Sequence, residues 1–142
     1  TDLVMTAAES EGIYIGEDEA KGSEKGYSQG GHINITSDVK GAARAGTLVH
    51  EYAHELLHWK DTSKFYVGDK DSRSPDTVET QAESVSFAVL THYSIPCKHH
   101  STYIALHNKG KSAVMANLKA IHRATTHIIK KIDAAERARS EP

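Results

Sequence analysis

Residues 48–58 combine an apolar helix face with two histidines four positions apart, and this pattern constrains the chain more than any other segment. It predicts a helix that begins after a cap at Ser37 or Asp38 and runs to about Trp59. Because a helix turns about 100° per residue, His50 and His54 leave the same face, one turn apart. The residues expected to face the core are Leu48, Val49, Tyr52, Ala53, Leu56 and Leu57.

The segment His50-Glu51-Tyr52-Ala53-His54 is typical of a catalytic zinc site. Two imidazole nitrogens on one helix face can converge on a zinc ion at about 2.0–2.1 Å. Glu51 follows the first ligand directly, so its carboxylate can take a proton from water beside the ion and act as general base. The alternative is a pair of histidines that only contribute to core packing, but the amphipathic helix favours the metal site.

A catalytic zinc usually has three protein ligands, so a third ligand must come from elsewhere in the chain. We expect it from a second helix that begins near Pro75, ends near Tyr93 and packs antiparallel to the first. Glu79 and Glu83 lie on one face of that helix, and Glu79 also completes a capping box with Asp76. We therefore favour Glu83 as the third ligand, with Glu79 as the alternative. The apolar stripe beside them consists of Val78, Ala82, Val85 and Val89.

His58 continues the four-residue spacing of the two candidate ligands. It would lie about 12 Å from His50 along an unbroken helix, at about 1.5 Å per residue, and so cannot bind the same ion. A longer zinc-binding pattern with a third histidine would need Gly where Leu57 stands and His where Lys60 stands. We expect His58 either beside the ligands or at the rim of the cleft.

Further side chains in the second half of the chain are candidates for contact with substrate. Tyr103 is the preferred residue to polarise a carbonyl group beside the metal, with Tyr93 as the alternative. Both tyrosines are equally compatible with ordinary half-buried positions. His92, His99 and His100 can bind substrate, although exposed surface positions explain them better.

The rest of the chain predicts a mostly helical α+β fold. A short helix over residues 2–10 precedes strands at 13–15 and 33–35, and the polar segment 16–31 is either a long hairpin loop or the edge of a small sheet. A final helix over about 112–137 is expected, with a frayed tail. Its buried stripe is expected to comprise Val114, Leu118, Ile121, Ala124, Ile128, Ile132 and Ala135.

The bulk composition is that of one globular domain over residues 1–142. A formal net charge of -2 gives no general attraction to nucleic acid or anionic lipid. Cys97 is the only cysteine, which fits a reducing compartment, and no apolar run approaches the ~20 residues that span a bilayer. We expect a cytoplasmic protein without membrane contact. Thr1 is not a start methionine, so we expect a processed chain or the C-terminal part of a longer protein.

Two segments resemble the ImmA/IrrE-type zinc metallopeptidases. Leu48–His58 resembles their active-site helix, and Glu79–Ala88 resembles their second signature, in which the glutamate shortly before an aromatic residue is the third zinc ligand. That glutamate maps onto Glu83. Gly31–Ile35 is similar to the strand that leads into the active-site helix. Tyr103–Ala105, followed by a long helix, resembles the metallopeptidase half of ArdC-like antirestriction proteins.

The resemblance covers roughly residues 12–135 and implies a zincin-like domain of bacterial, phage or plasmid origin. It implies hydrolysis of a peptide bond in a repressor with a helix-turn-helix domain or in another regulatory protein. DNA contact would require a separate single-stranded-DNA-binding domain, as in ArdC-like proteins. Ser84 and Val85 stand where many members have Ala and Asn, which weakens any inference about the substrate. The alternative function is a non-catalytic, zinc-scaffolded module that docks a repressor.

Overall fold

The computed structural model describes residues 2–19, 25–67, 75–96 and 117–140, apart from the side chains of residues 75 and 76. The helices are α1 (Asp2–Glu9), α2 (Gly41–Leu57), α3 (Pro75–His92) and α6 (Leu118–Ser140). The strands are β1 (Tyr14–Asp18), β2 (Gly26–Ser28) and β3 (His32–Thr36). The predicted α+β class, with a small sheet near the N-terminus, is confirmed.

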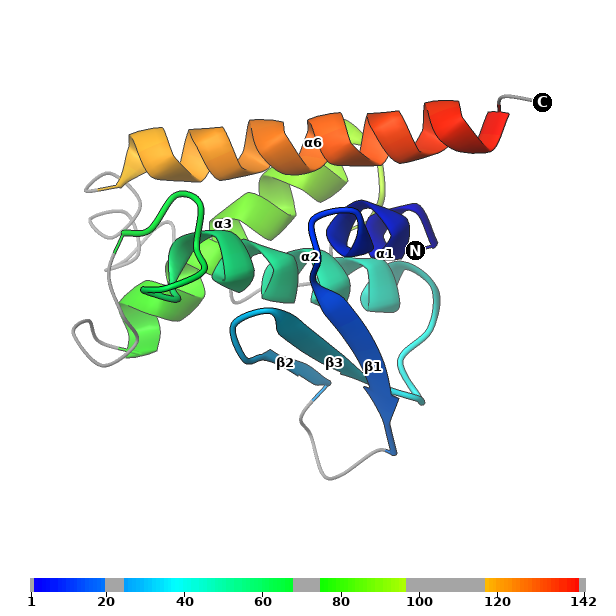
Figure 1. Cartoon of the computed structure of the whole chain (residues 1–142), viewed down its shortest axis with the longest axis horizontal. Helices are drawn as coiled ribbons and strands as arrows, with labels where there is room; N and C mark the ends of the chain where they lie inside the picture. The colour runs from blue at the N-terminus through cyan, green and yellow to red at the C-terminus, as the bar shows by residue number, and fades with distance from the viewer. Residues whose placement is uncertain (1, 20–24, 68–74, 97–116, 141–142) are drawn as a thin grey trace.

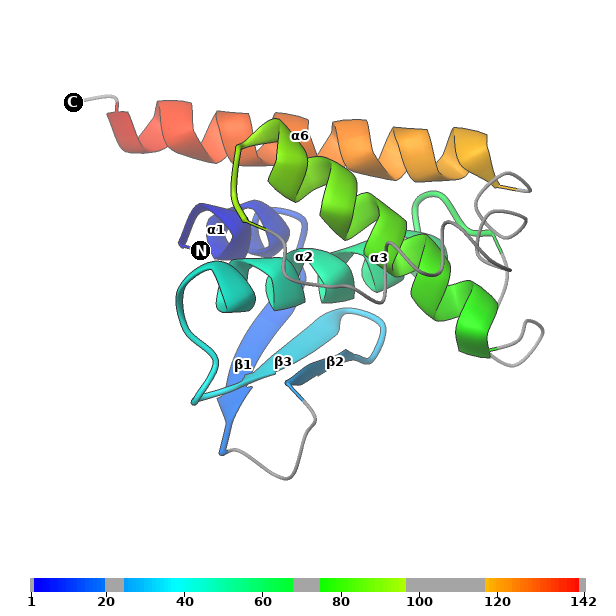
Figure 2. The ribbon, with the colours of Figure 1, turned by 180° about the vertical axis from the view of Figure 1, so that it is seen from behind.

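Helix α2 lies at the centre of the fold (Figure 1). The sheet packs along one side of it, and α1, α3 and α6 lie on the other side. All residues from 45 to 58 are buried except His50, which is half-buried. The six apolar residues of α2 that were expected to face the core are all buried, so that prediction is confirmed. Seen from behind, α3 runs directly in front of α2 (Figure 2).

The sheet has three strands in the order β1-β3-β2. β1 pairs with β3 in parallel, from Tyr14 opposite His32 to Asp18 opposite Thr36. β2 pairs with β3 antiparallel and lies inside the segment expected to be a loop or a sheet edge. The prediction that this segment forms a sheet edge is therefore confirmed. The alternative, a long hairpin loop between the two expected strands, is wrong because those strands run parallel.

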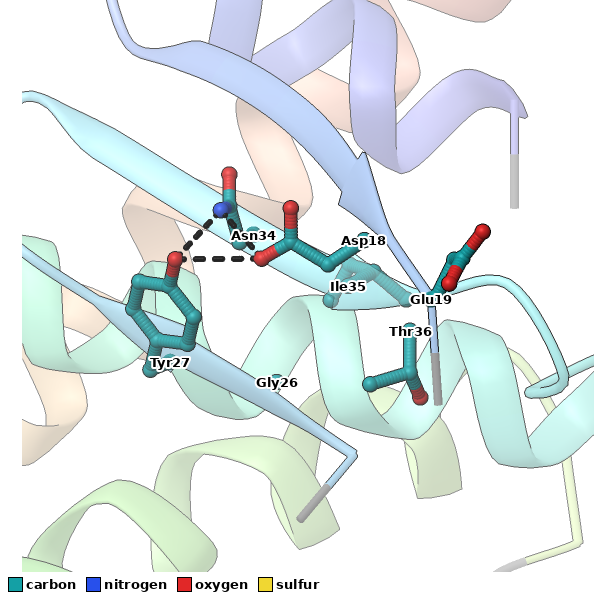
Figure 3. A pocket seen from close by; sticks show the side chains of 7 residues that line it. All are labelled: Asp18, Glu19, Gly26, Tyr27, Asn34, Ile35 and Thr36. Carbon is teal, nitrogen blue, oxygen red and sulfur yellow. Dashed lines mark hydrogen bonds between the residues drawn. The ribbon is translucent and has the colours of Figure 1, made fainter. Parts of the chain in front are cut away.

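Polar side chains connect the three strands on the sheet face that carries Asn34, where they line a small pocket (Figure 3). Asn34 of β3 donates from its amide nitrogen to Asp18 of β1 at 2.7 Å and to the hydroxyl of Tyr27 of β2 at 2.5 Å. Tyr27 in turn donates to Asp18 at 3.1 Å. Ile33 and Ile35, the alternate residues of β3, are fully buried in the core. The sheet thus has one apolar face and one hydrogen-bonded polar face.

The predicted cap of α2 at Ser37 or Asp38 is wrong. The residue before the helix is Lys40, which makes no side-chain capping hydrogen bond. The backbone N–H of Ser37 instead donates to the carbonyl oxygen of Asp18 at 2.7 Å, and that of Val39 donates to Thr36 at 3.2 Å. Residues 37–39 therefore complete the sheet with a turn, and the helix begins later than expected.

Helix α3 spans the predicted range, and its expected apolar stripe is buried. In α6 five of the expected stripe residues are buried, but Leu118 is 48% exposed because it is the first residue of the helix. Val114 lies outside the described residues. Helix α6 continues to Ser140, beyond its expected end near Arg137, and residues 141 and 142 lie outside the described residues. None of the described helices is long and apolar enough to cross a membrane.

The buried carboxylate of Glu55 attaches α2 to the turn between β2 and β3. It accepts hydrogen bonds from the backbone N–H groups of Gly30 at 2.9 Å and Gly31 at 2.5 Å, and from the hydroxyl of Ser28. Both glycines have positive φ, 75° and 88°, a conformation that lets successive N–H groups point at one anion. The indole of Trp59 donates to the Ser28 hydroxyl oxygen at 2.8 Å.

We predict that Glu55→Ala lowers the free energy of unfolding of the metal-free protein by about 3 kcal/mol, because it leaves the turn's N–H groups without their acceptor. Glu55→Gln retains one acceptor oxygen and should cost about half as much. Urea unfolding in the presence of a chelator measures both, and the fluorescence of Trp59 reports on the turn itself. The control is Glu17→Ala, which removes a half-exposed ion pair with Arg44 and should cost less than about 1 kcal/mol. Equal losses for Glu55→Ala and Glu17→Ala would contradict the assigned role.

Candidate metal centre

His50 and His54 project from α2 toward α3, as their spacing predicts. Their Nε2 atoms are 3.1 Å apart, and the two rings meet edge to face at 79°. The side chain of His54 is 1% exposed and that of His50 is 13% exposed. Two imidazole nitrogens on one helix therefore face a common point at the α2–α3 boundary.

Helix α3 runs antiparallel to α2 and brings Glu79 to the same point. Ser86 of α3 donates to the carbonyl oxygen of Gly46 at 3.2 Å. Glu79, which comes earlier in α3, contacts His50 and His54, which come later in α2. Glu79 Oε2 is 2.9 Å from His50 Nε2, and Glu79 Oε1 is 3.3 Å from His54 Nε2. Among the described residues these three form the one group of His, Cys, Asp or Glu side chains that can hold a metal ion.

Glu83, the favoured third ligand, lies on a different side of His50. Its Oε1 contacts Nδ1 of the His50 ring, while the Nε2 side of that ring faces Glu79. The structure therefore brings Glu79, and not Glu83, to the pair of Nε2 atoms. The carboxylate of Glu79 contacts the two histidines, so the capping box does not account for its position. The side chain of Asp76 lies outside the described residues.

The charges around His50 change its protonation. Burial by itself would lower its pKa, but hydrogen bonds to Glu79 and Glu83 and the charges of Glu51 and Glu83 outweigh burial and raise the pKa to about 10. The pKa of Glu79 is held well below its usual range chiefly by its hydrogen bond to His50. Without a metal, a protonated His50 therefore stands among three carboxylates.

Glu51, the predicted general base, is 7% exposed and follows His50 directly on α2. Its negative charge contributes to the raised pKa of His50. The structure therefore places Glu51 on α2 next to His50, with its charge acting on that imidazole.

His58 lies directly behind His54 and is fully buried, so its expected position beside the ligands is confirmed and the rim position is wrong. Helix α2 ends at Leu57, and His58 caps its last turn. The Nδ1 atoms of His54 and His58 are 2.9 Å apart, and Nε2 of His58 is 2.8 Å from the side-chain oxygen of Gln81 on α3.

Gln81 is the site residue that the sequence reasoning missed. It follows Val78 by three positions and precedes Val85 by four, so it lies on the apolar stripe of α3. A polar residue on such a stripe needs a buried partner, and this mismatch was a signal for its role.

Tyr93 is excluded as a carbonyl-polarising residue. It lies ten positions beyond Glu83, about 15 Å along the helix at about 1.5 Å per residue. Its hydroxyl donates to Asp133 of α6 at 2.6 Å, and burial together with this carboxylate raises its pKa above the usual range. The neighbouring His92 is exposed on the surface, as expected. Candidates outside the described residues are His99, His100 and Tyr103.

Comparisons of the chain with models of protein families, with curated proteins and with solved structures found no match. The case for a function therefore rests on the residues of this site and on the resemblance of its two helices.

The two glutamates of α3 can be separated by zinc binding. We predict that Glu79→Ala weakens zinc binding more than about 100-fold, because it removes a carboxylate from the Nε2 side. Glu83→Ala should still bind one zinc ion per chain, about 10–100-fold more weakly, because it removes only the partner of Nδ1. Metal analysis after gel filtration and competition with a coloured chelator measure both, with the exposed Glu136→Ala as control. The reverse order of the two losses would make Glu83 the ligand.

The raised pKa of His50 predicts that zinc affinity rises with pH above neutrality. At pH 7 to 8.5 the folded, metal-free protein still holds the His50 proton, which zinc must displace. One displaced proton makes the apparent affinity rise about tenfold per pH unit over this range. Chelator competition at pH 7.0, 7.75 and 8.5 measures the slope. Glu83→Gln removes one cause of the raised pKa of His50 and should make this slope smaller. A zinc affinity that does not change with pH in the unchanged protein would show that His50 is already neutral.

Proposed function

We propose that the protein is a zinc-dependent metallopeptidase in which His50, His54 and Glu79 bind the ion and Glu51 is the general base. The observation that carries this proposal is the convergence of two histidine Nε2 atoms and one carboxylate from a second helix. A glutamate directly after the first histidine supplies the base that such a site needs for hydrolysis.

The spacing of the donor atoms supports zinc. Two ligands bound at about 2.0–2.1 Å in tetrahedral geometry are about 3.3 Å apart. The distances here are 3.1 Å between the Nε2 atoms, 2.9 Å from His50 to Glu79 and 3.3 Å from His54 to Glu79. Two imidazoles and one carboxylate are also a ligand set found in catalytic zinc sites, which keep one position for water.

The chemistry divides between the metal and Glu51. When bound, zinc supplies a Lewis acid that polarises a carbonyl group and lowers the pKa of water to about 7. Glu51 accepts the proton of the attacking water and passes it to the amine that leaves when the peptide bond breaks. The role of Tyr103 as a further group that polarises the carbonyl stays a prediction.

The resemblance of α2 and α3 to ImmA/IrrE-type proteins supports a protein substrate. On that basis the proposed target is a regulatory protein of a phage, plasmid or other mobile element, such as a repressor with a helix-turn-helix domain. The formal net charge of -2 gives no reason to propose direct binding to DNA by this domain.

The burial of Glu51 favours a second candidate function. The whole residue is 7% exposed and so has little contact with solvent, where a general base must meet water. The second candidate is a zinc-scaffolded module that docks a repressor without cleaving it. Co-incubation with a candidate repressor, followed by mass spectrometry of the intact chains, separates the two functions. Fragments indicate cleavage, and an intact repressor in a stable complex indicates docking.

We predict that Glu51→Gln retains one zinc ion per chain but lowers peptide hydrolysis about 10²–10⁴-fold, the usual contribution of a general base. A peptide library digested with the zinc-loaded protein and read by mass spectrometry supplies the assay. Glu136→Ala, an exposed substitution on α6, is the matched control and should cleave like the unchanged protein. Undiminished cleavage by Glu51→Gln would rule out its role as base.

A further inference from the structure

We propose that Gln81 and His58 are positioning residues that hold His54 in the tautomer protonated on Nδ1, so that the lone pair of Nε2 points toward the metal. The proposal rests on the proposed function only in assuming that His54 is a metal ligand. It concerns a buried row of three side chains that begins at Gln81 on α3 and ends at the metal side of His54.

The three side chains are isolated from solvent. His58 and Gln81 are 0% exposed and His54 is 1% exposed. The oxygen of the Gln81 amide is 2.8 Å from His58 Nε2, and His58 Nδ1 is 2.9 Å from His54 Nδ1. Both distances are those of ordinary hydrogen bonds, and each nitrogen must therefore be either a donor or an acceptor in its contact.

The amide oxygen of Gln81 determines the direction of the whole row. An amide oxygen only accepts, so His58 carries its proton on Nε2. In a neutral His58 the other nitrogen, Nδ1, then only accepts, so His54 donates from Nδ1. His54 therefore has no proton on Nε2, the atom that faces His50 and Glu79. One buried amide thus selects the tautomer of a metal ligand two residues away in the row.

His50 is oriented by a different kind of group. Its Nδ1 contacts the carboxylate of Glu83, which can accept the Nδ1 proton and leave Nε2 toward the ion. If a carboxylate also stood behind His54, it would bury another negative charge beside Glu51, Glu79 and Glu83, at a high cost in solvation. The neutral pair of His58 and Gln81 orients His54 without adding that charge.

The tautomers can be read directly in the metal-free protein at a fixed pH of about 7.5. Long-range ¹H–¹⁵N correlation spectra distinguish a protonated Nδ1 from a protonated Nε2. We expect His54 to be protonated on Nδ1 and His58 on Nε2. A proton on Nε2 of a neutral His54, or on Nδ1 of a neutral His58, overturns the proposal whether or not the protein binds zinc.

Zinc affinity tests the consequence. Gln81→Leu removes the acceptor and should weaken zinc binding about 10–100-fold, the usual effect of losing a partner behind a metal ligand. Gln81→Glu restores an acceptor of the same length and should bind zinc at least tenfold more tightly than Gln81→Leu. Gln29→Leu makes the same change at an exposed position in the β2–β3 turn and should leave the affinity unchanged.

The outcomes separate the two proposals. If the unchanged protein does not bind zinc, the proposed function fails, and the spectra of the metal-free protein still decide the tautomers. If it binds zinc and Gln81→Leu binds zinc as tightly, the positioning role is overturned while the metal site stands. If Gln81→Leu does not fold, the spectra and the affinity of Gln81→Glu, expected within about tenfold of the unchanged protein, decide.

Discussion

Helix α2 is buried along nearly its whole length, so the polar side chains on it must form their hydrogen bonds inside the protein. Each of these bonds positions a different neighbour. Glu55 holds the turn between β2 and β3, and Tyr52 donates to Glu11 in the turn after α1. His58, directly after the helix, forms a hydrogen bond with Gln81 of α3. Because the buried polar side chains of α2 need hydrogen-bond partners, their bonds fix the positions of the sheet, α1 and α3 around it.

At the candidate metal centre this requirement is met by charge. Glu51, Glu79 and Glu83 surround His50, and in the absence of a metal the raised pKa of His50 supplies one compensating positive charge. One imidazolium among three carboxylates leaves the cluster negative. A divalent ion in place of the His50 proton brings the cluster closer to neutrality, and partly buried charges are stabilised when they are paired. Protonation of His50 and metal binding therefore compete, because each offsets the negative charge of the three carboxylates.

Local pattern predicted α2, α3 and the shared face of His50 and His54, because periodicity and the spacing of these two histidines depend only on one helix. It favoured Glu83 over Glu79, but it could not show which of them meets the two Nε2 atoms, since both lie on one face of α3 and the axial register of two packed helices is set by the whole core. It also could not show that β1 and β3 pair in parallel, because β2, which lies on the far side of β3, is too short to recognise. Gln81 was not among the predicted site residues because glutamine is not one of the usual zinc ligands.

Exposure differs sharply across the three proposed ligands. His54 is 1% exposed and rests on the buried His58 and Gln81, whereas the side chain of Glu79 is 56% exposed. Packing therefore holds His54, but Glu79 is held chiefly by its hydrogen bond to the protonated His50. A half-exposed carboxylate with a strongly lowered pKa stays ionised and can contact an ion before that ion loses its water. In the proposed zinc site, Glu79 is therefore the ligand most accessible from solvent and His54 the least accessible.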